Sequence, residues 1–270
     1  MQELAQQLSN LAKLALYQEL ETYPKPGLVS HIDNGSHTDM DHAIFLRSID
    51  ALGSYFHELV MAGINNVSFD ELKLLAIAAE TRMLKATNGI NTHRGAIFIF
   101  GLLIPGLSYL ISRGLDSETL SATIIKNYSA DLSTHKPNPA SHGSKIREQY
   151  QLEGIIDSAG KGFPLIFAAL EELSSYMQLY TNETYIRLKL FFYIMQHLDD
   201  TNLVYRGGID ALKYAKIEAA QLSKIECNKM QYDAALSLHH DFIRKNLSPG
   251  GSADVFAAVV FLDMVRQIWD

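Results

Sequence analysis

The chain has 270 residues, of which 47% are hydrophobic and 20% are charged, and its formal net charge is −7 at pH 7. This size and composition are typical of one soluble globular domain over residues 1–270, and the negative charge argues against general binding to nucleic-acid phosphates. The single cysteine, Cys227, excludes an internal disulfide, and no basic segment followed by an apolar one opens the chain. We therefore expect a cytoplasmic protein that binds neither nucleic acid nor a membrane.

Apolar residues recur with helical spacing along most of the chain. The first amphipathic segment, residues 3–20, is expected to stop at Pro24. A second helix is expected to begin near Thr38, which has with Asp41 the spacing of a capping box, Asp replacing Glu. Further helical segments are expected over residues 68–86, 96–111, 116–132, 163–180, 183–198, 208–222, 232–247 and 252–269. No segment alternates with the period of a strand, so the sequence predicts an all-α domain of roughly ten helices.

The longest apolar run, residues 96–111, is shorter than the ~20 residues that a membrane span needs. Pro105 and Gly106 interrupt it. We expect a buried helix that is kinked or ended near the proline.

Polar residues and glycines concentrate at four junctions, each of which precedes an expected helix. They cover residues 22–42, 87–96, 199–208 and 246–254, and a looser fifth junction covers residues 141–163. The first turn of a helix carries unpaired N–H groups and a partial positive charge. Several such N-termini converging on one place would form a nucleotide pocket, and this is the architecture that we expect.

The junction NLSPGGSAD, residues 246–254, has a turn at Ser248 and two glycines, Gly250 and Gly251, that permit close backbone approach to a ligand. Ser252 is expected to cap the last helix. The junction lacks the lysine of a GxxxxGK[ST] phosphate loop, so it is a weak signal for nucleotide by itself. Asp254 is explained by the helix dipole, and it also suits Mg²⁺.

In TNGINTHRGA, residues 87–96, either Asn91 or Thr92 can cap the apolar helix that follows. His93 and Arg94 then lie in its first turn, where cationic side chains oppose the helix dipole. Such violations of local preference are expected where an anion binds.

In DDTNLVYRGG, residues 199–208, Asp199 and Asp200 are expected at the end of a helix, where carboxylates oppose its dipole, and Arg206 precedes a Gly-Gly break. Paired carboxylates suit Mg²⁺, which often binds a nucleotide through its phosphates. The DDxxD spacing of prenyl-diphosphate synthases is absent from this junction.

His240 and Asp241, with His197 upstream, raise the alternative of a helical HD-type phosphohydrolase. His240 and Asp241 also fit the polar face of an ordinary amphipathic helix. We favour this structural explanation.

The first junction, TYPKPGLVSHIDNGSHTDMDH, residues 22–42, is the densest in polar groups. Its two prolines extend the backbone and so fix the direction of Lys25. Capping of the following helix accounts for Thr38, Asp39 and Asp41. The residues without such an explanation are Lys25, Asp33 and His37.

Taken in order, ETYPKPGLVSHIDNGSHTDMD, ATNGINTHRGAIF, DTNLVYRGG and NLSPGGSADVFAAVVFL resemble the ATP:dephospho-CoA triphosphoribosyltransferase family, over nearly the whole chain. The resemblance implies an all-helical enzyme that transfers the triphosphoribosyl group of ATP to the 2'-hydroxyl of 3'-dephospho-CoA and releases adenine. The product is the prosthetic-group precursor of citrate lyase or malonate decarboxylase. The implied partners are these two small molecules, and a homodimer is a possible assembly.

The chemistry that the resemblance implies gives the junction residues hypothetical roles. Asp33 is the preferred general base, because no cap uses its loop carboxylate, and His37 is the second choice. Asp39, Asp200 and Asp254 are assigned to Mg²⁺. The residues assigned to ATP and its phosphates are Lys25, Ser36, Asn91, Thr92, His93, Arg94, Arg206, Ser248, Gly250, Gly251 and Ser252.

The chain departs from the family pattern in the fifth junction. After SHG at 141–143, Ile156 and Ser158 stand where an arginine and a glutamate are expected. Two alternatives follow: the same scaffold acting on another ribosyl acceptor or on water, or a nucleotide-binding protein without catalysis.

Overall fold

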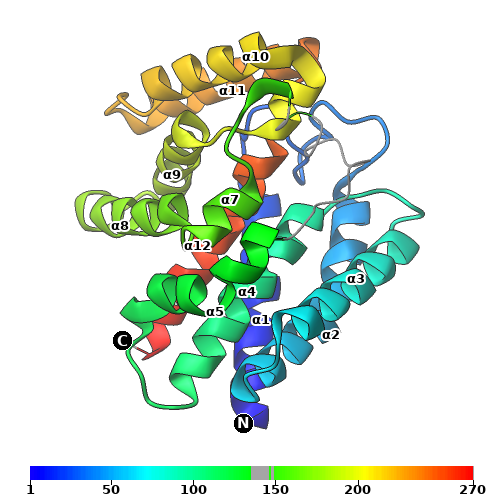
Figure 1. Cartoon of the computed structure of the whole chain (residues 1–270). Helices are drawn as coiled ribbons and strands as arrows, with labels where there is room; N and C mark the ends of the chain where they lie inside the picture. The colour runs from blue at the N-terminus through cyan, green and yellow to red at the C-terminus, as the bar shows by residue number, and fades with distance from the viewer. Residues whose placement is uncertain (135–145, 147–148, 270) are drawn as a thin grey trace.

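The computed structural model describes residues 1–134, 146 and 149–269. Within these residues the chain forms helices and no strand, which confirms the all-α prediction (Figure 1). The helices of the first half are α1 (Gln2–Glu21), α2 (His42–Ile64), α3 (Phe69–Ala86), α4 (Arg94–Ile111), the short 3₁₀ helix η1 (Ser117–Thr119) and α5 (Leu120–Thr134). Those of the second half are α7 (Ile155–Gly160), α8 (Pro164–Leu179), α9 (Glu183–His197), α10 (Thr201–Leu222), α11 (Asn228–Arg244) and α12 (Gly250–Trp269).

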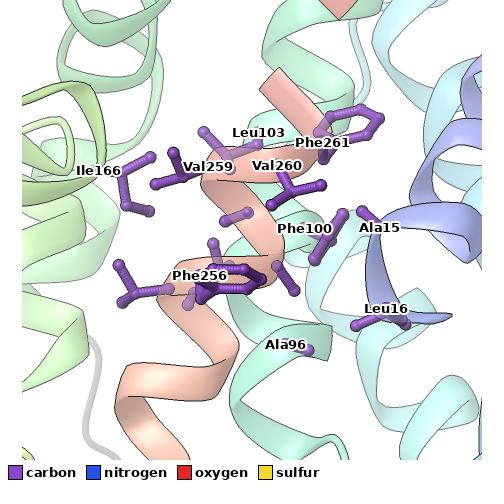
Figure 2. Packing of buried hydrophobic residues seen from close by; sticks show 14 of the residues in the cluster. Ala15, Leu16, Ala96, Phe100, Leu103, Ile166, Phe256, Val259, Val260 and Phe261 are labelled. Carbon is purple, nitrogen blue, oxygen red and sulfur yellow. The ribbon is translucent and has the colours of Figure 1, made fainter. Parts of the chain in front are cut away.

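Helix α12 lies at the centre of the fold because it is apolar on nearly every side. Every residue from 255 to 262 is buried, as expected of a helix surrounded by protein. It packs against α1, α4, α8 and α9. Figure 2 shows Phe256 and Phe261 of α12 among side chains of α1, α4 and α8. Phe100 of α4 stacks against Phe261 with ring centroids 5.3 Å apart.

Two further layers extend this core. Helices α2 and α3 cover α1 and α4 on one side, whereas α9, α10 and α11 form the other end of the molecule (Figure 1). The segment of residues 22–41, which joins α1 to α2, lies beside this second group of helices and contacts α11.

Several predicted helix starts and ends are wrong, each by a few residues. Helix α2 begins at His42 rather than near Thr38, because the Asp41 carboxylate accepts from the N–H of Ile44 at 2.8 Å and acts as the N-cap. Helix α12 begins at Gly250, so Ser252 lies inside the first turn instead of capping it. Asp200 begins α10 as its N-cap; it does not end the preceding helix.

Helix α4 continues through Pro105 to Ile111, so the proline does not end it. Among the described residues it is the one helix long and apolar enough to cross a membrane, and 72% of it is buried against other helices. A buried core helix of a globular protein passes the same test of length and composition. The expected break in the GG pair is confirmed, since Gly208 has a φ of +73° inside α10.

Candidate active site

A cavity of about 660 Å³ lies where the N-termini of five helices meet, a volume in the range of small-molecule sites. Its lining includes the first residues of α4, α7, α8, α10 and α12. Segment 22–41 closes one side through Leu28, Val29, His37 and Met40. Because each helix N-terminus carries a partial positive charge, the arrangement favours an anionic ligand. The predicted convergence of the junctions is therefore confirmed.

The structure brings most of the predicted site residues to this cavity, but not all of them. Those that line it are His37, Asn91, Thr92, His93, Arg94, Asp200, Arg206, Ser248, Gly250, Gly251 and Asp254. Those that are not among its lining residues are Lys25, Asp33, Ser36, Asp39 and Ser252.

His37 belongs to a polar cluster with Arg206 and Ser248. Its Nδ1 lies 3.1 Å from Nη2 of Arg206, and its Nε2 lies 2.9 Å from the hydroxyl of Ser248. A guanidinium only donates, so Nδ1 accepts and Nε2 carries the proton that it donates to Ser248. Burial and the Arg206 charge lower the pKa of His37 to about 4. At neutral pH His37 is therefore a neutral donor, which leaves no free basic nitrogen for the general-base role predicted for it.

His93 is also neutral and does not supply the cationic charge expected of it. It is 3% exposed and begins α4 as its N-cap, and burial lowers its pKa to about 3. Thr92 donates to Ser48 at 2.6 Å, and the Ser48 hydroxyl lies 2.6 Å from Nδ1 of His93. Nε2 is buried without a hydrogen-bond partner in the described part of the chain, and the imidazole meets the ring of Phe45 edge to face at 5.1 Å. The group acts as a fixed part of the cavity wall.

Asp200 caps two helices at once. One oxygen accepts from the N–H of Asn202 at 3.0 Å in α10, and the other accepts from the N–H and hydroxyl of Ser252 in α12, at 2.8 and 3.0 Å. Gly251 contributes a further backbone N–H. The carboxylate that was predicted to hold Mg²⁺ thus has its lone pairs occupied by the protein. This pair of caps also fixes where the two helix N-termini meet.

Asp254 lies on the first turns of α12 and faces the N-terminus of α4. It accepts from the N–H of Ala96, and burial, Glu19 and Asp200 together raise its pKa well above its usual range. A Cβ on Gly95 would fall 2.0 Å from its Oδ2, so only glycine permits this close approach. Asp254 is consequently a carboxyl that resists ionisation in the cavity wall.

Lys25 is turned away from the cavity and is almost fully buried, with 1% of its surface exposed. Its ammonium lies 2.7 Å from Oε1 of Glu19 and also donates to the carbonyl oxygen of Glu19. Burial lowers the pKa of Lys25, and the Glu19 carboxylate opposes this shift. The expected phosphate contact of Lys25 is therefore replaced by an internal ion pair, and Glu19 is the member of the pair that lines the cavity.

Asp33, the preferred general base, is engaged elsewhere. Both of its oxygens lie 3.0 Å from Nε2 of His239, which is fully buried on α11. Nδ1 of the same ring contacts the backbone of segment 22–41, at Lys25 O (2.8 Å) and Gly27 N (3.2 Å). The pair fastens the segment to α11 and holds Asp33 away from the cavity.

Of the remaining predicted residues, Arg94 lines the cavity, whereas Ser36 and Asp39 do not. The Ser36 hydroxyl bonds the carbonyl of Leu247 at 2.6 Å and anchors the segment that carries His37. Asp39 is exposed and lies 3.7 Å from Nδ1 of His37. Arg94 lines the cavity but pairs with Glu80 of α3.

Ile156 and Ser158, the two departures in the fifth junction, both line the cavity from α7. Ile156 is one of several apolar lining residues, with Ile155, Leu165 and Phe98, whereas Ser158 adds a hydroxyl. Residues 141–143, which belong to the same junction, lie outside the described part of the chain.

Sequence reasoning missed Glu19 and His239. Glu19 continues the buried stripe of α1 that runs through Ala5, Leu8, Ala12 and Leu16, so a charge at an apolar position was a readable signal. His239 gave no comparable signal, because it is followed by a second histidine, His240, and only the fold shows which of the two is buried.

The lining is acidic despite the helix N-termini. Among the described residues it contains two guanidiniums, Arg94 and Arg206, against five carboxyl groups. These are Glu19, Glu153, Asp199, Asp200 and Asp254. Glu19, Glu153 and Asp199 pair with lysines, so the positive charge that the described lining itself presents to a polyphosphate is limited to the two guanidiniums.

Comparison with known proteins gives a consistent result over the whole chain. The model of the ATP:dephospho-CoA triphosphoribosyl transferase family matches residues 5–270. A probable 2-(5''-triphosphoribosyl)-3'-dephosphocoenzyme-A synthase of Acinetobacter calcoaceticus is 36% identical, over 97% of this chain and 92% of the relative. The 2-(5''-triphosphoribosyl)-3'-dephosphocoenzyme-A synthase of Haemophilus ducreyi is 33% identical, over 95% and 88% respectively. No solved structure matches the chain. From the match over residues 5–270 and these identities, the chain belongs to the ATP:dephospho-CoA triphosphoribosyl transferase family.

Proposed function

We propose that this protein transfers the triphosphoribosyl group of ATP to the 2'-hydroxyl of 3'-dephospho-CoA, releasing adenine. The product is the prosthetic-group precursor of citrate lyase or malonate decarboxylase. Family membership supports the reaction, and the single observation in the structure that carries it is the meeting of five helix N-termini at one cavity. Such termini bind phosphates through backbone N–H groups.

The cavity offers groups for the two ends of ATP. The Gly250-Gly251 start of α12, Ser248 and Arg206 form a polar side suited to the triphosphate. Ser248 accepts a hydrogen bond from His37, so its own hydroxyl hydrogen is free to donate to a phosphate oxygen. The apolar side near Phe98 and Ile156 suits a base or the thiol-bearing arm of the acceptor.

The carboxylates predicted to hold Mg²⁺ do not fit a metal site formed by the protein. Asp39 lies outside the lining, Asp200 is used by two helix caps, and the described residues contain no group of three or more His, Cys, Asp or Glu arranged for a metal. We propose that Mg²⁺ enters bound to the triphosphate. The acidic lining supports this, because phosphates that carry a divalent ion are less strongly repelled.

Ile156 and Ser158 raise the question of which ribosyl acceptor the protein uses. They line the cavity in place of charged groups expected from the family pattern, but the family match and the relatives named as synthases favour transfer to 3'-dephospho-CoA over another ribosyl acceptor or water. The non-catalytic alternative has less support, because charged and polar groups persist throughout the cavity.

A cytoplasmic location and a homodimer stay predictions. The burial of α4 supports a protein free of the membrane. Exposed apolar side chains on α3, Leu74 at 65% and Ile77 at 53%, offer a surface where a second copy could pack. Analytical ultracentrifugation measures the assembly directly.

The reaction is tested by incubating the protein with ATP, Mg²⁺ and 3'-dephospho-CoA and following adenine by chromatography and the adduct by mass spectrometry. We expect adenine and adduct in equal amounts, with adenine formed only when the acceptor is present. Adenine release that ignores the acceptor would indicate hydrolysis instead, and ATP binding without turnover would indicate a binding protein.

A further inference from the structure

Glu19 is a buried carboxylate that faces the cavity from the last turn of α1. Its residue is 5% exposed, and it belongs to the cavity lining. The helical stripe that it continues is otherwise apolar or small. Placing a charge on such a stripe costs stability unless the charge is paired, so its presence there needs an explanation.

Lys25 supplies the pairing and orients the carboxylate. Its ammonium bonds Oε1 of Glu19 at 2.7 Å and also bonds the carbonyl oxygen of the same residue. Two contacts to one residue hold both the backbone and the side chain of Glu19. The second oxygen, Oε2, has no hydrogen-bond partner among the described residues. One oxygen is thus fixed by a cation, and the other is available to a ligand.

The other carboxyl groups of the lining are less suited to accept a proton. Asp200 is occupied by two helix caps, and Asp254 has no cationic partner and resists ionisation. Glu153 and Asp199 are more exposed than Glu19 and pair with Lys161 and Lys216. Asp33 is bound to His239, outside the lining.

We propose that Glu19 is the general base that takes the proton of the attacking 2'-hydroxyl, with Lys25 as the residue that positions it; this inference rests on the proposed function. As the acceptor oxygen bonds to C1' of the ATP ribose, the C1'–N9 bond breaks and its electron pair leaves with adenine. The hydroxyl proton passes to Oε2 of Glu19. Adenine takes up one proton on release, so the overall proton count is unchanged.

The test is Glu19→Gln, assayed with ATP, Mg²⁺ and 3'-dephospho-CoA. Loss of a general base lowers kcat by about 10²-fold or more, and we expect the KM for ATP to change only a few-fold. Glu21→Gln is the matched control, because Glu21 lies on the same helix turn, is also paired, and binds His31 and His42 outside the lining. It should keep kcat near that of the wild type.

A double variant separates catalysis from the loss of a buried ion pair. Glu19→Gln with Lys25→Met leaves no unpaired buried charge, so the protein should fold and melt near the wild-type temperature but stay inactive. Recovery of kcat in the double variant would show that Glu19 only neutralises Lys25 and would overturn the proposal. A raised KM for ATP with unchanged kcat in Glu19→Gln would overturn it too, by assigning Glu19 to substrate binding. Wild-type protein that forms no adduct would instead contradict the proposed function.

Discussion

At the scale of single residues, two histidines of the cavity wall, His37 and His93, are neutral at pH 7 rather than cationic. His93 begins a helix where a cation was expected to meet an anion, and His37 was the second choice for the general base. Arg206 and burial keep His37 neutral, and burial keeps His93 neutral. A neutral imidazole can donate one hydrogen bond in a fixed direction but cannot offset a phosphate charge.

These shifts predict a loss of stability in acid. The folded-state pKa values, about 4 for His37 and about 3 for His93, lie below the ordinary value of 6.5. As the pH falls below 6.5 the unfolded chain binds protons that the folded chain refuses, so the free energy of unfolding decreases toward pH 4, by at most about 1.4 kcal/mol per pH unit for each histidine. Above pH 6.5 these two groups contribute no pH dependence.

Urea unfolding of His93→Asn at pH 7 and pH 5 measures this effect. The variant should lose less stability between the two pH values than the wild type, whatever its stability at pH 7. His240→Asn changes an exposed histidine and serves as the control. Because carboxyl groups titrate equally in all three proteins, an unchanged slope in His93→Asn would contradict the burial of a neutral imidazole.

At the scale of elements, the sequence identified helices better than it identified their ends. The stripe of α1 and the apolar run of α12 were readable because burial leaves a period in the sequence. The start of α2 was misplaced because Thr38 and Asp41 are both good caps, and only the path of segment 22–41 decides between them. Helix α4 continues past Pro105, and neighbouring helices bury most of it.

Asp200 caps two helices, so replacing it should lower the free energy of unfolding by more than the loss of a single cap. We expect Asp200→Ala to lower the free energy of unfolding by about 2–4 kcal/mol, because each lost N-cap costs about 0.5–2 kcal/mol and buried donors are left unpaired. Asp199→Ala breaks a partly exposed ion pair with Lys216 and should cost less than about 1 kcal/mol. Denaturant titration followed by circular dichroism measures both, and equal losses would contradict the double cap.

At the scale of the whole molecule, the charge of the cavity predicts that ATP binds together with Mg²⁺. The cavity combines five helix N-termini with more carboxyl groups than guanidiniums. Mg²⁺ with ATP should therefore raise the melting temperature by several degrees at saturation, since a ligand at a hundredfold excess over Kd contributes about 2.7 kcal/mol. ATP with a chelator should raise it much less.

Adenosine, which lacks the phosphates, provides the control for this measurement. Its effect on the melting temperature should be the same with Mg²⁺ and with the chelator. If ATP stabilised the protein equally in both conditions, the acidic lining would not govern binding.

The sequence by itself determined the helical class, the apolar core and the four junctions, because burial and capping leave local patterns in the order of residues. Eleven of the sixteen residues that it assigned to the site line the cavity, since polar groups and glycines cluster where helices begin. Only the tertiary structure decided what each of these residues does. Lys25, Asp33 and Asp200 were assigned to phosphate binding, general-base catalysis and Mg²⁺ respectively, yet each has a partner from a separate segment: Glu19, His239 and Ser252. The packing of the helices determines which partner lies beside each charged group. It therefore also determines whether that group is free to contact a ligand or forms an ion pair or hydrogen bond within the protein.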